Sequence, residues 1–600
     1  MKLSNYIFQK LVDSGYDTVF MVTGGGAMHL NDAVGRIKGI NFICNHNEQA
    51  CSMAAEGYAR IKNKPAIVSV TTGPGSINAL NGVFGAFTDS IPMIVISGQV
   101  KAETMLSKYN IPGLRQLGDQ EVEIIPMVKG ITKYSCCITD PKSIRFHLEK
   151  AIFLATNGRP GPVWLDIPVD IQASDVDEIT MEQFVPTNEM MIDNSALKED
   201  VKKVIHLLDR AKRPVFIGST GIKLANAIEV FDNTLELSGV PVVSAWGHDF
   251  IDFNHVQYVG KQGSIGDRAG NFAVQNSDLV IIIGSRMPIR QVSYNWENFA
   301  RKAYKIQVDI DKAEMSKPTI KIDLPLNYDA KDFLTELNRQ LREYQFEKRN
   351  FIDWLDWCIV RKNKYPVVQD KHKDPSKPIN PYYFISELHK MLGEHDIIAC
   401  GDATACIVTF QTSQLKKGQH MFSNSGCASM GFDLPSSIGA AVASKNSRVI
   451  CMAGDGSIQM NIQELQTIVQ HSLNIKIIVL DNNGYLSIKS TQNNFFGLSV
   501  GSHPDSGVSF PDMEKVGIAY GIPSFNISRF DFQDELNKYI EIPGPVLINV
   551  KLDQNQLFEP KLSSKQMSNG KMVSAPLEDM FPFLSEEELK SNMLIDTIKF

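Results

Sequence analysis

The chain has 600 residues, of which 43% are hydrophobic and 21% charged, and its formal net charge is -7. This length exceeds the usual size of a single core, so we expect about three or four domains of an ordinary globular protein. The mild charge argues against a general nucleic-acid surface, and no apolar run approaches the ~18 residues of a membrane span.

The N-terminus, Met1 to Lys10, lacks the uninterrupted apolar core of a secretory signal. We therefore expect a cytoplasmic protein whose partners are neither nucleic acids nor membranes.

Strands alternate with helices over residues 1–172, which predicts an α/β domain with a doubly wound parallel sheet. The predicted strands are 18–22, 41–44, 66–70, 93–97 and 163–167. The turns after the first three of these strands are glycine-rich or polar: Gly24-Gly25-Gly26, His46-Asn47-Glu48 and Thr71-Thr72-Gly73-Pro74-Gly75. Such turns are typical of the ligand-binding edge of an α/β sheet.

A second α/β region is expected at 190–340, after an acidic, weakly periodic linker at 173–200. Its predicted strands are 214–217, 240–244, 279–283 and 305–308. The charged and Trp-rich segment 340–377 leads to a third α/β domain at 376–552. Residues 553–600 are predicted to form an irregular tail, which serves either as a lid or as a surface strap.

Two turns of the third domain are the most informative feature of the chain. Gly454-Asp455-Gly456-Ser457 follows a predicted buried strand at 449–453, and Asp481-Asn482-Asn483-Gly484 follows a helical pattern at 462–472 and a strand at 475–480. Strand–helix–strand units make neighbouring parallel strands, so both turns are expected at the same carboxyl edge.

These turns carry the donors of a metal and anion site. The Asp455 carboxylate, the Asn482 amide oxygen and the Gly484 carbonyl suit Mg²⁺, which prefers hard oxygen ligands and shares its shell with phosphates. The N–H groups of Gly456 and Ser457 suit the anion. Either sequence alone is usually an ordinary turn, but the pair at this spacing predicts a site for a metal-bound diphosphate.

Glu48 begins a predicted helix directly after a strand. Taken alone, it is an acid that complements the helix dipole. Together with the two turns, however, the pattern His46-Asn47-Glu48-Gln49-Ala50 resembles the thiamine diphosphate-dependent enzymes. In that family this glutamate hydrogen-bonds the aminopyrimidine ring and promotes removal of the proton from the reactive carbon.

The resemblance extends over nearly the whole chain and is greatest to acetohydroxyacid synthase (acetolactate synthase). It implies a pyrimidine-binding first domain, a middle Rossmann-like domain and a diphosphate-binding third domain. It also implies a homodimer or homotetramer, because the glutamate acts on the cofactor of a neighbouring subunit. The residues it assigns to the cofactor are Gly25, Gly26, Thr72, Gly73, Asn78, Met430, Gly454, Gly456, Ser457 and Gly484.

The middle domain resembles the FAD-binding domain of the same family. Arg286 and Arg290 match its Arg-x-x-x-Arg segment, and Asp309 and Ile310 match a second FAD segment. FAD is therefore an expected cofactor beside thiamine diphosphate and Mg²⁺. The alternative is a retained but empty Rossmann-like domain.

The expected substrate pocket departs from acetohydroxyacid synthase. Gln120 matches a substrate-contacting residue, but three apolar positions have become Asp119, Ser264 and Gln492. A pocket for a methyl or ethyl group should be apolar, since its discrimination rests on burial of about 1–3 kcal/mol per methylene. Polar walls favour an acceptor that carries hydroxyl groups, such as a sugar-like carbonyl compound.

We therefore expect a thiamine diphosphate- and Mg²⁺-dependent carboligase. It would decarboxylate a 2-keto acid, with pyruvate as the expected donor, and transfer the acyl-anion unit to a carbonyl acceptor, with Glu48 and Gln120 as catalytic residues. The alternatives are acetolactate synthase proper in branched-chain amino acid biosynthesis, a 2-keto acid decarboxylase or cyclic-diketone hydrolase, and a non-catalytic cofactor-binding subunit.

Overall fold

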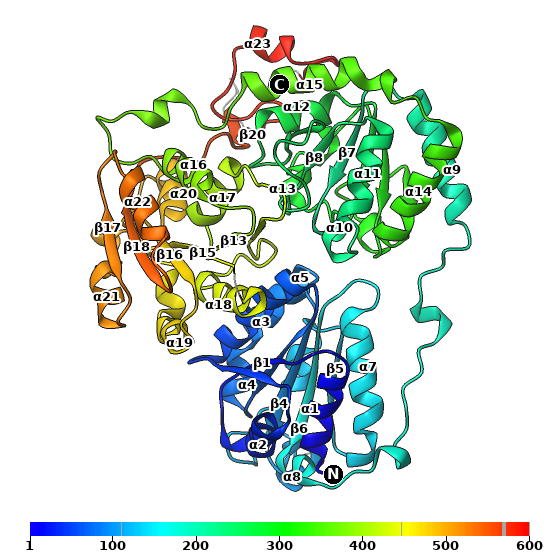
Figure 1. Cartoon of the computed structure of the whole chain (residues 1–600), viewed down its shortest axis with the longest axis vertical. Coiled ribbons are helices and arrows are strands. Elements are labelled where there is room, and N and C mark those ends of the chain that lie inside the picture. Colours follow the sequence, from blue (N-terminus) through cyan, green and yellow to red (C-terminus); the bar gives the residue numbers. More distant parts are fainter. Residues whose placement is uncertain (110, 446, 567–571, 599–600) are drawn as a thin grey trace. The chain divides into compact units, whose positions relative to one another are not determined.

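The computed structural model describes residues 1–109, 111–445, 447–566 and 572–598 (Figure 1). The chain forms two compact units, of which one comprises Met1–Met190, His395–Cys406 and Phe422–Gln554 and the other the rest. No helix among the described residues is long and apolar enough to cross a membrane.

The N-terminal domain is built on a six-stranded sheet with strand order β2-β1-β3-β4-β6-β5. All neighbouring strands run parallel, which confirms the predicted sheet. The strands are β1 (Thr18–Met21), β2 (Asn41–Cys44), β3 (Ala66–Val70), β4 (Met93–Gln99), β5 (Tyr134–Cys137) and β6 (Pro162–Pro168). The helices are α1 (Leu3–Asp13), α2 (Met28–Arg36), α3 (Glu48–Lys62), α4 (Pro74–Asn78), α5 (Leu80–Thr88), α6 (Ile124–Val128), α7 (Ile144–Thr156) and α8 (Val169–Ala173).

The C-terminal domain repeats this strand order as β14-β13-β15-β16-β18-β17. Its strands are β13 (Ile397–Cys400), β14 (His420–Phe422), β15 (Val449–Gly454), β16 (Ile475–Asp481), β17 (Ser524–Ile527) and β18 (Val546–Lys551). The helices from Pro381 onward are α16 (Pro381–Met391), α17 (Thr404–Thr412), α18 (Asp433–Ser444), α19 (Glu464–Gln470), α20 (Leu486–Phe496), α21 (Met513–Ala519) and α22 (Gln533–Ile540). The order reverses between β13 and β15, where open α/β sheets bind ligands beyond their carboxyl ends.

These two domains pack against each other through α3 and α18 (Figure 1). A Cβ atom on Gly57 would collide with the carbonyl of Ser436, and one on Gly439 would collide with the carbonyl of Ala54. Glycine at these positions therefore allows the two helix backbones to approach closely. One buried apolar cluster contains side chains of both sheets.

The middle domain belongs to the other compact unit and has the strand order β12-β11-β10-β7-β8-β9. This is the order of dinucleotide-binding Rossmann folds, whose ligands lie where the order reverses, here between β7 and β10. The strands are β7 (Pro214–Gly218), β8 (Val242–Ser244), β9 (Tyr258–Lys261), β10 (Leu279–Ile283), β11 (Tyr304–Val308) and β12 (Leu324–Leu326). The helices are α9 (Leu197–Arg210), α10 (Thr220–Leu224), α11 (Ile228–Ser238), α12 (Arg268–Asn276), α13 (Ile289–Val292), α14 (Ala330–Tyr344) and α15 (Ile352–Lys364).

Some segments differ from their predictions. The helical pattern at 462–472 forms the shorter α19 (Glu464–Gln470), which a 3-10 helix, Ile458–Asn461, precedes. Segment 340–377 contains α15 rather than only a connection. The tail includes β19 (Ser564–Gln566), β20 (Met572–Ser574) and α23 (Glu586–Ser591).

The tail packs against the middle domain. Glu578 is buried, accepts a hydrogen bond from Gln275 at 2.5 Å and pairs with Arg301 at 2.8 Å. Leu577 and Met580 are also buried. The described part of the tail is therefore a packed strap of this unit.

Candidate active site

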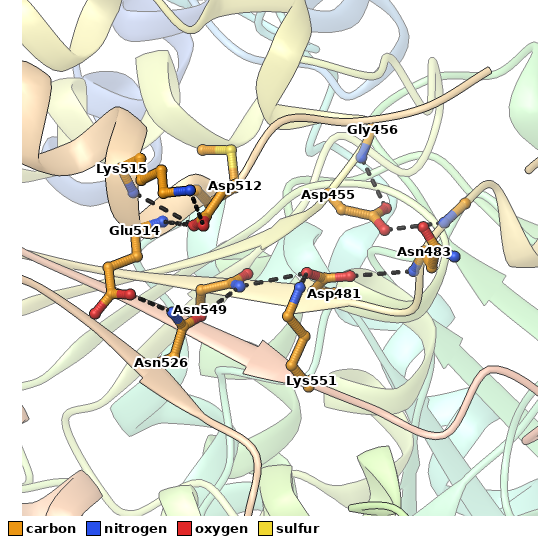
Figure 2. Close-up of polar contacts among 12 residues, drawn as sticks. Asp455, Gly456, Asp481, Asn483, Asp512, Glu514, Lys515, Asn526, Asn549 and Lys551 are labelled. Atoms are coloured by element: carbon orange, nitrogen blue, oxygen red, sulfur yellow. Dashed lines mark hydrogen bonds and ion pairs between the residues drawn. The ribbon is translucent and has the colours of Figure 1, made fainter. Parts of the chain in front are cut away.

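The turns after β15 and β16 are joined directly. The Gly484 N–H donates to Asp455 Oδ2 at 3.0 Å, and the Gly456 N–H donates to Asp455 Oδ1 at 2.8 Å (Figure 2). Asp455 is 4% exposed, and burial is the main reason that its pKa rises to about 7. The geometry places the Asp455 carboxylate beside the second turn, where a cation would stabilise its ionised form.

Asn482 belongs to the second turn and carries a buried oxygen without a described donor. The residue is buried, and its Oδ1 accepts no hydrogen bond from the described residues, while its Nδ2 donates to Thr404 Oγ1 at 3.4 Å. A buried carbonyl oxygen without a donor is costly unless a ligand or an ion completes it. Carboxylate and amide oxygens at one sheet edge fit Mg²⁺.

Gly484 has a φ of +151°, and a Cβ atom there would collide with the carbonyl of Ser502. Its own carbonyl accepts from the Leu486 N–H at 3.1 Å, which leaves one lone pair for the predicted metal contact. The position therefore requires glycine for its conformation as well as for space.

Asp481, which the sequence reasoning did not single out, braces this turn. Its Oδ1 accepts from the Asn483 N–H at 3.2 Å, and its Oδ2 is paired with Lys551 and accepts from Asn549 at 3.3 Å (Figure 2). An Asp that bonds the backbone two residues ahead is a recognised turn signal. The sequence Asp-Asn-Asn-Gly therefore contained this information.

Ser457 is hydrogen-bonded to the segment that carries Met430. Its hydroxyl donates to the buried Asp433 carboxylate and accepts from the Gly431 N–H at 2.8 Å. Burial is the main reason that the pKa of Asp433 rises to about 6. Met430 stays 36% exposed, so its apolar side chain is open to a ligand. A Cβ atom on Gly454 would lie 4.0 Å from the Ser457 Cβ, which is ordinary contact.

Glu48 is placed by the N-cap of α3 and by a neighbouring loop. Asn47 caps the helix by accepting from the Gln49 N–H at 2.8 Å. Glu48 Oε2 accepts from Asn78 Nδ2 at 2.9 Å, and a Cβ atom on Gly75 would lie 3.1 Å from Glu48 Oε1. The structure thus brings Glu48 together with the Thr72–Asn78 loop, as the sequence predicts.

Gln120 lies on the other side of this loop. Gly73 has a φ of +60°, and a Cβ atom there would collide with the Gln120 carbonyl. Gln120 itself has a φ of +61° and is exposed. Gly26 lies against Thr72, at 2.8 Å from a constructed Cβ atom to the Thr72 methyl carbon, while Gly25 faces open space.

Glu464 links the two domains of this unit and was also missed. It is fully buried at the start of α19 and accepts from Asn45 Nδ2 at 2.8 Å and from the His46 N–H at 2.9 Å. These residues directly precede Asn47 and Glu48. No local sequence pattern distinguishes Glu464 from any acid in the first turn of a helix.

The residues predicted for FAD lie at the carboxyl edge of the middle sheet. Gly284 follows β10 with a φ of +58°, and its carbonyl accepts from the Gly221 N–H at 3.0 Å. Arg286 is half-buried and Arg290 exposed, whereas Asp309 is buried at the end of β11 and is followed by the half-buried Ile310. An acid and two arginines at the edge of a Rossmann sheet fit a dinucleotide.

The polar positions of the expected pocket have different surroundings. Asp119 is exposed next to Gln120. The Gln492 amide is already used, because it donates to the Val500 carbonyl at 2.9 Å and accepts from the Val500 N–H at 3.0 Å. Ser264 belongs to the other unit, where its N–H donates to the Arg290 carbonyl at 2.7 Å.

Comparison with known proteins agrees with this geometry. Residues 1–121 match the N-terminal TPP binding domain of thiamine pyrophosphate enzymes, residues 201–337 match their central domain, and residues 401–550 match their C-terminal TPP binding domain.

Curated relatives match over most of the chain. "Acetolactate synthase, chloroplastic" from Arabidopsis thaliana is 30% identical over 579 residues, which cover 94% of this chain and 83% of the relative. "Acetolactate synthase isozyme 2 large subunit" from Escherichia coli (strain K12) is 30% identical, with 94% and 99% covered. "Acetolactate synthase large subunit" from Lactococcus lactis is 29% identical, with 93% and 94% covered.

Proposed function

The chain belongs to the thiamine pyrophosphate enzyme family, and from this premise we propose that it is a carboligase dependent on thiamine diphosphate and Mg²⁺. It decarboxylates a 2-keto acid, with pyruvate as the donor, and transfers the acyl unit to a carbonyl acceptor. The names of its relatives support an acetolactate synthase-like reaction.

One observation carries the proposal: the Asp455 carboxylate is bonded to the turn whose Asn482 Oδ1 lacks a donor among the described residues. Asp455, Asn482 and the Gly484 carbonyl would hold Mg²⁺, and the N–H groups of Gly456 and Ser457 would approach the diphosphate. Thiamine diphosphate, when bound, supplies the electron sink for decarboxylation.

Glu48 would exchange the proton that activates the cofactor. Its Oε2 is occupied by Asn78 Nδ2, whereas its Oε1 lies 3.1 Å from the position of a Cβ atom on Gly75. Oε1 is therefore the atom that would exchange a proton with the cofactor ring. Gln120 is proposed to contact substrate, and Met430 to contact the cofactor.

The acceptor is proposed to carry hydroxyl groups. Asp119 and Gln120 are both exposed beside Gly73, and polar side chains favour a polar partner over a bare methyl or ethyl group. Gln492 contributes less to this argument because its amide is bonded to Val500. The second candidate is acetolactate synthase proper, which the names of the relatives favour.

The proposal includes FAD in the middle domain and a homodimer as the smallest active form. The strand order and the placement of Arg286 and Asp309 support FAD. Ile77 on α4 and Phe84 on α5, two helices that contact α3, are each 41% exposed, and exposed apolar side chains near a site favour an interface. A purified protein without flavin that gains no activity with FAD would contradict the FAD assignment.

The experiment is an assay with pyruvate, Mg²⁺ and thiamine diphosphate, in which CO₂ and acetolactate are measured separately, with and without a hydroxylated aldehyde. We expect CO₂ release and a ligated product that depends on the aldehyde. Abundant acetolactate from pyruvate alone would favour acetolactate synthase proper. Acetaldehyde as the sole organic product would indicate a decarboxylase, and no turnover with any 2-keto acid would overturn the proposal.

Two glutamate variants make the assay specific. Glu48→Gln should lower turnover by about 10²–10⁴-fold while cofactor binding persists. The matched control is Glu229→Gln, which changes an exposed acid in the first turn of α11 and should keep full activity. Wild-type turnover in Glu48→Gln would rule out the assigned role.

A further inference from the structure

The side chain of Gln99 ends β4 and is 1% exposed, yet it lies between two loops of the candidate site. Its Oε1 accepts from Thr72 Oγ1 at 2.8 Å and from the Val100 N–H at 2.9 Å. Its Nε2 donates to the Val122 carbonyl at 2.8 Å and to Asp166 Oδ2 at 3.0 Å. Both donors and both acceptor positions of the amide are therefore in use.

The hydrogen bonds of Gln99 Oε1 and Nε2 join it to two different segments of the candidate site. Thr72 precedes Gly73, Pro74 and Gly75, the loop that packs against Glu48. Val122 follows Glu121, whose buried carboxylate accepts from the Gly118 N–H at 2.9 Å and from the Leu117 N–H at 3.1 Å. This second segment carries Gln120.

Asp166 fixes the direction of the amide. It is 2% exposed on β6, and its Oδ1 accepts from Ser97, whose hydroxyl accepts from Trp164 Nε1 at 2.8 Å. Reversing the Gln99 amide would turn its carbonyl towards the Asp166 carboxylate and the Val122 carbonyl, and its NH₂ towards the Val100 N–H. Such mismatches leave buried polar groups without partners, which is costly, so one orientation is selected.

We propose that Gln99 is a positioning residue. Its amide bonds Thr72, in the loop that packs against Glu48, and Val122, in the segment that carries Gln120, and it thereby sets the spacing between Glu48 and Gln120. The inference rests on the proposed function, in which Glu48 and Gln120 serve one reaction. Gln99 itself is too buried to touch substrate, so it acts through Thr72 and Val122.

Hydrogen exchange of the full-length protein without cofactor tests the placement directly. Gln99→Glu keeps the acceptor for Thr72 and Val100 but replaces the NH₂ by an acceptor, so we expect the amides of segment 116–122 to exchange about tenfold faster or more. Thr72→Val removes only the bond from Thr72 Oγ1 to Gln99 Oε1, so faster exchange should be confined to 71–78. Unchanged exchange of 116–122 in Gln99→Glu, or of 71–78 in Thr72→Val, would overturn the proposal.

Kinetics test the consequence for the reaction. Gln99→Glu should lower kcat by about tenfold or more with a smaller change in the KM for thiamine diphosphate, because a misplaced group weakens the reaction more than binding. Combining it with Asp166→Asn offers an amide donor to the carboxylate introduced at position 99 and should restore part of kcat. Wild-type kcat in Gln99→Glu, or no recovery in the double variant, would contradict the role.

Two further variants serve as a control for Gln99→Glu and as a substitute for it. Gln257→Glu places a carboxylate at a buried glutamine whose amide donates to the Leu235 and Val240 carbonyls of the middle domain, and it should leave exchange of both segments unchanged. If Gln99→Glu does not fold, Gln99→Asn replaces it, since the shorter amide cannot reach both loops. An inactive wild type would defeat the proposed function, while the exchange experiment still decides whether Gln99 joins the loops.

Discussion

Asn482 offers a side-chain oxygen to a cation at the edge of the C-terminal sheet, because no described donor bonds its buried Oδ1. We expect Asn482→Ala to raise the Mg²⁺ concentration needed for thermal stabilisation with thiamine diphosphate by about tenfold or more, as loss of a metal ligand does. The control is Asn233→Ala, which removes an exposed amide that donates to the Glu229 carbonyl within α11 of the middle domain. Equal Mg²⁺ dependence in both variants would contradict the ligand assignment.

The buried Asp166 carboxyl group is expected to make the free energy of unfolding depend on pH. Burial is the main reason that its pKa rises from 3.8 to about 7 in the folded protein. Between these values the folded state holds a proton that the unfolded state has lost, so this group makes the free energy of unfolding decrease as pH rises. Below about pH 4 both states are protonated, and the contribution no longer changes.

The measurement compares wild type with Asp166→Asn by thermal denaturation from pH 4 to pH 8. We expect the wild-type midpoint, relative to that of the variant, to fall as the pH rises towards about 7. Asn can still offer an oxygen to Gln99, so the variant is suited to remove the titration with limited loss of hydrogen bonding. A constant difference across this range would show that Asp166 does not titrate there.

Individual side chains also show where sequence reasoning ends. Asp455, Asn482 and Glu48 were predictable because each follows a recognisable strand, and parallel topology brings strand ends together. Gln99 and Glu464 were not, because their partners lie far along the chain and depend on tertiary packing. The contacts of Gln492 were not predictable either, since its amide is bonded to Val500 beyond the end of α20.

Among the secondary-structure elements, long apolar strands were predicted best. Ala66–Val70 and Leu279–Ile283 match their predictions residue for residue, because buried parallel strands form continuous apolar runs. Short strands such as Leu324–Leu326 lack such a run. The predicted helix at 462–472 was too long because residues 462–463 and 471–472 form turns at the two ends of α19.

The contact between α3 and α18 makes a prediction about glycine. A methyl group on Gly439 would collide with the Ala54 carbonyl of α3, so Gly439→Ala must push the helices apart. We expect a loss of about 1–3 kcal/mol in stability, the usual cost of overpacking. The matched control is Gly35→Ala in α2, where nothing lies within 4 Å of a constructed Cβ atom; helix propensity there favours alanine by roughly 0.5–1 kcal/mol. Equal thermal midpoints for the two variants would contradict close packing of the helices.

For the protein as an assembly, the central question is which chains form one active site. The proposed homodimer pairs Glu48 of one subunit with Asp455 and Asn482 of another. Two variants that are each inactive then become informative together. Glu48→Gln removes the activating carboxylate, and Asp455→Asn removes a metal ligand, so neither homodimer retains a complete site.

Mixed dimers of these variants should recover activity. A dimer of one Glu48→Gln chain and one Asp455→Asn chain contains one site with both residues intact if the sites are shared between subunits. Random mixing makes half of the dimers mixed, so we expect about one quarter of wild-type activity. The measurement is the rate of CO₂ release from pyruvate after co-expression with separate affinity tags and purification of the doubly tagged dimer, in which the expected rate rises to about half. If Glu48 and Asp455 of the same chain served one site, every site in the mixed dimer would lack one of them, and no activity would return.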